Sequence, residues 1–119
     1  MENFQIFEIK NYMVIWRQAE KRMFGETEVV IRGIVRCTGD EYSMDVIFYA
    51  PESPYPDPVI ELDKKKGYMF LPMSDMLAFV DILRNEKPIY GHLRADRTDW
   101  TSVTTSQEPV GEGEIDTSG

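Results

Sequence analysis

The segment from Glu28 to Cys37 constrains the fold more than any other part of the chain, because its side chains alternate with a period of two. Its mainly apolar face consists of Val29, Ile31, Gly33, Val35 and Cys37. Successive side chains of a strand point to opposite sides, so Arg32 and Arg36 fall on the other face with Val30 and Ile34. Residues 38–41 are typical of a turn, and residues 42–50 follow as an antiparallel partner. The chain is therefore predicted to build an antiparallel sheet.

Other short apolar segments add strands to this prediction. Residues 4–10 and 13–18 are separated by Asn11-Tyr12, which favours a first hairpin, with a helix over residues 16–23 as the alternative. Residues 59–62 and 68–71 predict two more strands on either side of a turn. Residues 89–96 alternate again, and residues 100–105 are rich in β-forming residues, so both are predicted strands.

A proline-rich segment and one amphipathic helix interrupt the strands. Residues 51–58 contain four prolines, which cannot donate to a ladder, so we expect an exposed loop of polyproline character. Ser74 is the expected N-cap of a helix that runs to about residue 85. Its apolar stripe consists of Met76, Phe79, Val80 and Leu83. The predicted fold class is α+β, with a curved antiparallel sheet of five to eight strands packed against one main helix at about 74–85.

Length and charge bound the organisation of the chain. Its 119 residues suit a single α+β domain over residues 1–106. Residues 107–119 are rich in Gly, Glu and Ser, and we expect a disordered acidic tail there. The net charge is −8, and the tail contributes four acids and no base. This balance argues against a general affinity for nucleic acid or for anionic membranes.

The sequence indicates a cytoplasmic protein without cofactors. It shows neither a basic and apolar leader nor an apolar run long enough to span a bilayer, so no contact with a membrane is expected. The single Cys37 cannot form an internal disulfide, which fits a reducing compartment. It falls on the apolar face of its strand, and a small buried hydrophobe is a better interpretation than a reactive thiol.

Catalytic and metal-binding patterns are weak. His92 is the only histidine, and nothing in the sequence places a nucleophile beside it. The carboxylates Asp96 and Asp99, and those of the tail, lack the spacing of a calcium or zinc site. We therefore expect a protein that is not an enzyme and holds no metal.

Basic and aromatic side chains suggest a binding face instead. Tyr90, His92 and Arg94 share one face of a predicted strand, and Arg97 lies in the following turn. Arg32 and Arg36 share the outer face of another strand. If the two faces lie on the same side of one sheet, they form a surface suited to single-stranded nucleic acid, where rings stack on bases and guanidinium groups meet phosphates. A solvated face with cross-strand ion pairs is the competing interpretation.

Residues 67–83 carry a family resemblance. Phe70-Leu71-Pro72 ends a predicted strand, and the apolar stripe of the helix follows. This step resembles the strand-to-helix junction of the Whirly and Pur-alpha group of single-stranded-DNA-binding transcriptional regulators. The resemblance implies curved antiparallel strands before a helix, pairing as a homodimer, and contact with the nucleic acid through the sheet. The chain departs from that group in its acidity, in the strands after the helix and in lacking a second half-repeat.

Two hypotheses for function follow from the sequence. The first is a non-enzymatic module that binds single-stranded DNA or RNA through the basic and aromatic face. The second is a protein-interaction or assembly subunit that uses the loop at 51–58, a sheet edge or the acidic tail. The tail itself either confers solubility, docks on a partner's basic surface, or competes within the molecule for a basic patch.

Overall fold

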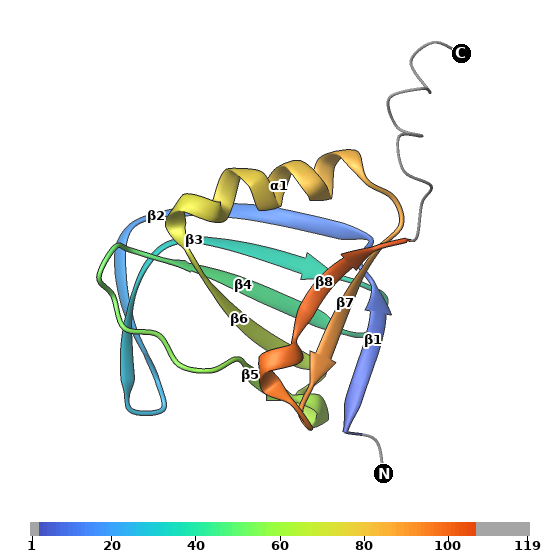
Figure 1. Cartoon of the computed structure of the whole chain (residues 1–119), viewed down its shortest axis with the longest axis horizontal. Coiled ribbons are helices and arrows are strands. Elements are labelled where there is room, and N and C mark those ends of the chain that lie inside the picture. Colours follow the sequence, from blue (N-terminus) through green and yellow to red (C-terminus); the bar gives the residue numbers. More distant parts are fainter. Residues whose placement is uncertain (1–2, 107–119) are drawn as a thin grey trace.

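The computed structural model describes residues 3–106, which form eight strands and one α-helix (Figure 1). The elements are β1 (Phe4–Glu8), β2 (Asn11–Phe24), β3 (Thr27–Thr38), β4 (Ser43–Tyr49), β5 (Val59–Glu61), β6 (Lys66–Pro72), α1 (Met76–Asn85), β7 (Ile89–Arg94) and β8 (Ser102–Thr105). This composition confirms the α+β class. The expected acidic tail lies outside the described residues.

The strands divide between two sheets, where the sequence predicted one. The larger sheet has the order β2-β3-β4-β6-β5, and the smaller has the order β1-β7-β8. All neighbours are antiparallel except β4 and β6, which are parallel because the chain crosses over through the proline-rich loop and β5 between them. In Figure 1 the small sheet lies to one side of the large one, with α1 along the upper edge.

The predicted hairpin between the first two strands is wrong. β1 pairs with β7, placing Phe4 opposite Arg94, whereas β2 pairs with β3. The two residues between them tie the sheets together, since the Ile9 amide donates to the Ile89 carbonyl and the Lys10 amide to the Thr38 carbonyl, both at 2.8 Å. The alternative helix over residues 16–23 is also wrong, because β2 remains extended to Phe24.

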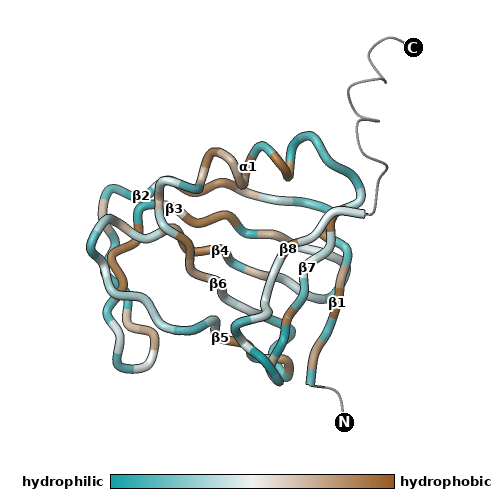
Figure 2. The backbone as a smooth tube through the Cα atoms, in the orientation of Figure 1, coloured by the Kyte–Doolittle hydropathy of each residue, from teal (hydrophilic) through white to brown (hydrophobic). Residues whose placement is uncertain are grey.

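The hairpin of β3 and β4 is confirmed, and it forms the centre of the large sheet. The predicted inward face of β3 is fully buried. This face is divided between the two sides of the sheet, because a bulge after Ile31 reverses the alternation of β3. Val29 and Ile31 lie on the same side as Ile34, and Val35 and Cys37 lie on the other side. Hydrophobic side chains of β3 and β4 therefore reach both faces, and these strands run through the middle of the fold in Figure 2.

Each face of the large sheet carries its own apolar cluster. The cluster on the side of α1 and the small sheet is built from Phe7, Val35, Cys37, Met44, Val46, Phe48, Met69, Met76, Leu83, Ile89 and Leu93. The opposite cluster consists of Val29, Ile31, Ile34, Ile47 and Phe70, with Phe24 packed edge-on against Phe70 at 4.9 Å between ring centroids. The second cluster arises where the far end of the β2–β3 hairpin brings Phe24 against β6.

The helix begins later than the sequence predicted. A single 3-10 turn at Met73–Asp75 precedes α1, and Ser74 does not cap it; Asp75 holds the N-cap position without a side-chain hydrogen bond. Met76 and Leu83 are buried, while Phe79 and Val80 are half-buried against the same cluster. Gly33 permits the approach of Met76, since a Cβ there would lie 2.5 Å from the Met76 sulfur.

The remaining predictions of local structure agree with the fold, except that β8 begins at Ser102 because Trp100 belongs to a 3-10 turn over Thr98–Trp100. β5 and β6 form the expected antiparallel pair, and residues 51–58 form no strand. β7 and β8 pair across a turn that contains the expected Arg97. No helix in residues 3–106 is both long enough and apolar enough to cross a membrane.

Candidate functional site

The six residues predicted to bind nucleic acid are divided between the two sheets. Arg32 and Arg36 lie on β3 of the large sheet. Tyr90, His92 and Arg94 lie on β7 of the small sheet, and Arg97 follows it. A single continuous face containing all six does not form, because the pairing of β1 with β7 separates the last strands from β3.

The small sheet nevertheless gathers aromatic and basic side chains on its outer face. Arg94 lies over the rings of Phe4 and Trp100, at 4.6 and 5.5 Å from their centroids, and Arg97 lies 4.4 Å from the Trp100 centroid. His92 hydrogen-bonds through Nε2 to the Thr104 hydroxyl at 2.8 Å. Burial, followed by the charge of Arg94, lowers the pKa of His92. We call Phe4, Arg94, Arg97 and Trp100 the small-sheet cluster.

Carboxylates neutralise the arginines of this cluster. Arg94 forms a two-pronged ion pair with Asp96, at 2.8 and 3.0 Å, and Arg97 pairs with Asp99 at 2.9 Å. These contacts raise the pKa of Arg94 and lower the pKa values of both aspartates. The net charge of the two ion pairs is zero, which weakens any attraction for phosphate groups.

Arg36 is also engaged, in a cluster around the buried Asp45 carboxylate of the large sheet. Its guanidinium donates to both oxygens of Asp45, at 2.9 and 3.1 Å, and Lys66 lies 3.2 Å from the same carboxylate. Asp45 is 1% exposed. The hydrogen bond to Asp45 is the largest cause that raises the pKa of Arg36. Three adjacent strands, β3, β4 and β6, supply this cluster, and sequence spacing gave no indication of it.

Arg32 has a local structural role. Its Nε donates to the Arg17 carbonyl at 3.2 Å, inside a bulge where three residues of β2 lie opposite one residue of β3. Glu20 accepts hydrogen bonds from Arg17 and Arg22, at 2.8 and 2.7 Å, and completes the bulge. Each of the four predicted arginines is therefore used by a contact within the fold.

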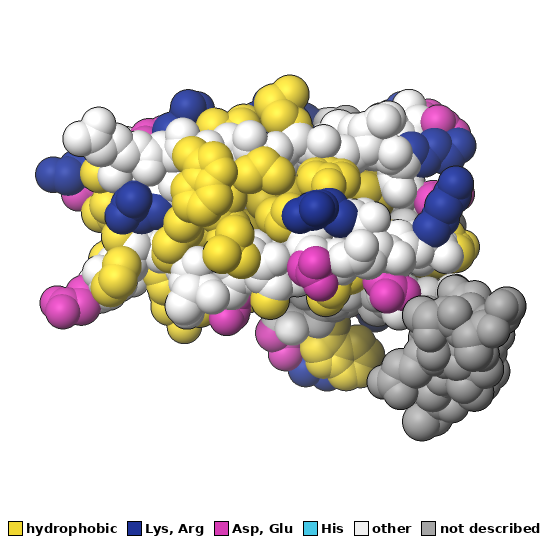
Figure 3. All heavy atoms as spheres, turned by 90° about the horizontal axis from the view of Figure 1, so that it is seen from above, with side chains coloured by type: hydrophobic (Ala, Val, Ile, Leu, Met, Phe, Trp, Pro, Cys, Tyr) yellow, Lys and Arg dark blue, Asp and Glu magenta, His cyan; other side chains and the backbone are white. Residues whose placement is uncertain are grey.

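A different surface combines exposed apolar side chains with cations. Trp16 is 57% exposed and lies on β2 opposite Gly33, the residue on which Met76 packs. Leu77, 71% exposed, follows Met76 directly on α1. Figure 3 views the molecule from above α1 and β2 and shows hydrophobic side chains gathered in the middle of this face, with basic side chains among them. Contiguous apolar patches of this kind mark interaction sites in soluble proteins.

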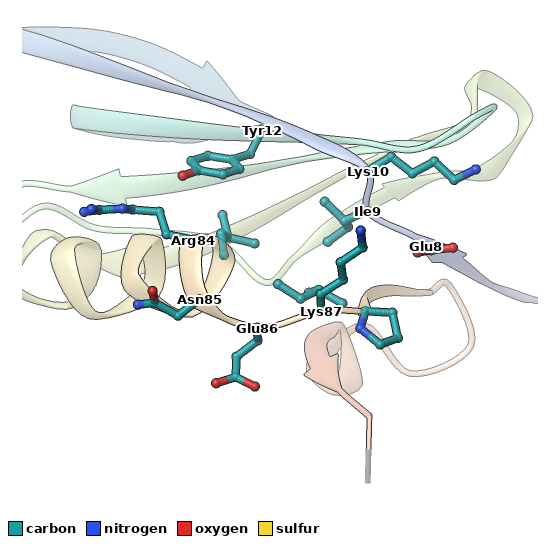
Figure 4. Close-up of a pocket in the computed structure, with 11 residues that line it drawn as sticks. Glu8, Ile9, Lys10, Tyr12, Arg84, Asn85, Glu86 and Lys87 are labelled. Atoms are coloured by element: carbon teal, nitrogen blue, oxygen red, sulfur yellow. The ribbon is translucent and has the colours of Figure 1, made fainter. Parts of the chain in front are cut away.

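Helical spacing extends this surface toward the C-terminal end of α1. Leu77, Val80 and Arg84 are three and four residues apart, so they share one flank of the helix. Arg84 and Tyr12 line the same groove and face one another across it in Figure 4. The flank that bears Leu77 is therefore the one beside β2. We call Tyr12, Trp16, Leu77, Val80 and Arg84 the β2–α1 surface.

The groove at the end of this surface has a volume of about 560 Å³. It lies between the last turn of α1 and the connection from β1 to β2, where Lys10, Arg84 and Lys87 provide basic side chains and Glu8 and Glu86 provide acidic ones. Lys10 pairs with Asp40 at 3.0 Å. No carboxylate within residues 3–106 forms an ion pair with Arg84 or Lys87.

The proline-rich loop is held against the fold. The rings of Tyr49 and Tyr55 stack at 4.5 Å and 9°. The Ser53 hydroxyl accepts a hydrogen bond from the Val30 amide and donates one to the Pro54 carbonyl, both at 2.9 Å. This loop places Tyr55, 56% exposed, at the surface on the side of β4.

Groups that could serve chemistry are few and dispersed. Cys37 is fully buried, and burial raises its pKa to about 12. Among the described residues, no group of three or more His, Cys, Asp or Glu side chains could hold a metal ion. The imidazole lies on β7, apart from the thiol and from the Asp45 cluster. The thiol lies on β3 beside Arg36 but contacts the Val35 carbonyl and not the Asp45 carboxylate.

The sequence did indicate the β2–α1 surface, through apolar residues that lie outside the periodic buried positions. Leu77 and Ile82 fall outside the stripe of buried helix positions, and both are exposed. Trp16 lies in an edge strand, where one face of a large side chain remains open to solvent. Large apolar residues at positions of a strand or helix that do not face the core therefore indicate such a surface.

Comparisons with protein-family profiles, with curated proteins and with solved structures give no significant match for this chain. The resemblance of residues 67–83 to the Whirly and Pur-alpha group stays a prediction.

Proposed function

We propose that this chain is a non-catalytic binding module that docks a partner protein on the β2–α1 surface. The observation that carries the proposal is the joint exposure of Trp16 and Leu77 on neighbouring elements, beside the outer edge of β2, which no other strand of residues 3–106 pairs with. Trp100 is as exposed as Trp16, but two arginines stack on it. Trp16 and Leu77 on the β2–α1 surface therefore offer apolar area that the core of the fold leaves exposed.

The surface favours a partner segment that carries both apolar side chains and carboxylates. Burying a large apolar side chain contributes about 1.5–3 kcal/mol, whereas an exposed ion pair contributes about 0–1 kcal/mol. Trp16 and Leu77 would therefore supply most of the affinity, and Arg84 and Lys87 would select an acidic partner on a protein that is itself acidic. The free edge of Asn11–Trp16 can accept an extended segment as an added strand.

Several features support a binding role over a catalytic one. Cys37 is inaccessible and protonated at neutral pH, since its pKa is near 12. His92 bonds to the Thr104 hydroxyl, but no carboxylate within residues 3–106 hydrogen-bonds to its ring to orient it as a base. The groove beside α1 contains Arg84, Lys87 and glutamates, but neither of these two groups.

The test compares partner capture by the wild type and two matched tryptophan variants. Trp16→Ser and Leu77→Glu should each lower partner binding at least tenfold, whereas Trp100→Ser should leave it unchanged. A partner that is retained by both β2–α1 variants but lost by Trp100→Ser contradicts the proposal. If the partner is a second copy of the chain, sedimentation gives a dimer for the wild type and a monomer for Leu77→Glu.

A second candidate function rests on the small-sheet cluster. We propose, as the alternative, binding of single-stranded nucleic acid there, because Arg94 and Arg97 stack on exposed rings in the manner that suits splayed bases. The pairing of both arginines with aspartates makes it the weaker candidate.

Fluorescence anisotropy with labelled single strands tests this alternative. If the alternative is right, the wild type binds the single strands more tightly than micromolar, and this binding weakens steeply with salt and is lost in Trp100→Ala. Absence of binding at low salt would exclude nucleic-acid binding by the small-sheet cluster.

A further inference from the structure

The groove at the end of α1 lies where the described part of the chain ends. β8 pairs with β7 so that Thr105 is opposite Ile89, and Ile89 lines the groove together with Lys87 and Pro88. Ser106, the last described residue, follows directly. The segment 107–119 therefore starts at the rim of the groove.

The sequence of that segment complements the groove in charge. It contains Glu108, Glu112, Glu114 and Asp116 without a single basic residue, and Val110 and Ile115 are its apolar members. Glu8 and Glu86 also line the groove, so the complementarity is local to Arg84 and Lys87. Both of these side chains are exposed, and neither forms an ion pair with residues 3–106. Ile9, Leu83 and Ile89 give its floor an apolar part.

The reach of the segment is sufficient. Thirteen residues can span about 45 Å when extended, and the ten residues of α1 are about 15 Å long. Attachment at the rim also gives the segment a millimolar effective concentration, so a weak individual affinity is enough to fill the groove.

We propose that the groove is a binding site for an acidic peptide segment and that residues 107–119 of this chain are its occupant. The carboxylates of the segment face Arg84 and Lys87, and its apolar residues lie on the floor. The docking itself concerns the isolated chain and does not depend on the function proposed above.

Paramagnetic relaxation in the full chain tests the docking. A spin label is attached through Ser118→Cys, with the buried Cys37 left in place and Val110 and Ile115 unchanged. We expect loss of amide signal concentrated at residues 8–12 and 84–89, with β5 and the loop at 51–58 unaffected. Loss that is spread evenly, that falls on another surface or that does not occur overturns the proposal.

Two charge variants identify the contact. Arg84→Gln combined with Lys87→Gln should restore the groove signals, whereas Lys64→Gln combined with Lys65→Gln, which removes two exposed charges elsewhere, should not. Restoration is also expected in about 1 M salt, where the screening length falls to about 3 Å. Signal loss that survives both the groove variant and the salt contradicts binding by charge. Since no partner is present, this result is separate from the outcome of partner capture.

Discussion

At the scale of single residues, the buried carboxylate of Asp45 governs what the basic side chains of the large sheet can do. It holds Arg36 and Lys66 across three strands. The sequence predicted that Arg36 lies on the other face of its strand from Val35 and Cys37. It could not show that an aspartate of the next strand forms an ion pair with the guanidinium. Ion pairs between strands depend on register, and register is not visible in the spacing of one strand.

Replacing Asp45 with asparagine tests the importance of this cluster for stability. Asp45→Asn keeps the shape but leaves two cations without their acid, so the free energy of unfolding should fall by about 2 kcal/mol. Urea denaturation measures this change in the free energy of unfolding. Asp96→Asn, which breaks an exposed pair, serves as the control and should lower the free energy of unfolding much less, because solvent screens that pair. Equal losses of unfolding free energy in the two variants would contradict a special role of the Asp45 cluster in stability.

The lowered pKa of His92 predicts a dependence of stability on pH. The folded protein binds the proton less readily than the unfolded chain, whose histidine titrates near 6.5. The contribution of His92 is therefore complete above pH 6.5 and is lost as the pH falls from there toward the folded pKa. The unfolding free energy of the wild type should decline relative to that of His92→Asn over this range. A relative increase on acidification would mean that the folded pKa is raised.

At the scale of elements, the sequence predicted most strands and the pairs β3–β4, β5–β6 and β7–β8, but not the partners of β1 and β2 or the parallel pairing of β4 with β6. The β3–β4 hairpin followed from alternation and a local turn, and β5, β6, β7 and β8 lay where turn residues and β-forming residues indicated. β1 and β2 were assigned to each other because they are neighbours in sequence. The actual partner of β1 is β7, more than eighty residues later, and no local pattern encodes such a contact.

The seating of α1 on the sheet depends on Gly33 and predicts a coupled pair of substitutions. Gly33→Ala forces its new methyl group against the Met76 side chain, which should cost about 1–3 kcal/mol. In a Met76→Ala background the same change should cost much less, because the clash is absent. Thermal or urea unfolding of all four proteins gives the coupling free energy. Additive effects would show that Met76 does not rest on Gly33.

At the scale of the whole molecule, the separation into two sheets decides where partners can bind. This separation divides the predicted basic face between the two sheets. Each of the four arginines of that face makes a contact within the fold. Trp16 and Leu77 remain exposed beside an edge strand. The fold class could be predicted from periodicity. The β2–α1 surface could not, because it depends on which apolar side chains remain outside the core after the sheets have formed.

Site-directed photo-crosslinking tests the central claim most directly. A photoreactive amino acid is placed at position 77 on α1, and at position 104 on the small sheet as the control. Illumination in the native cell should give one discrete protein adduct from position 77, which Trp16→Ser abolishes, and none from position 104. An adduct confined to position 104, or a nucleic-acid adduct there with nothing at position 77, would contradict docking on the β2–α1 surface.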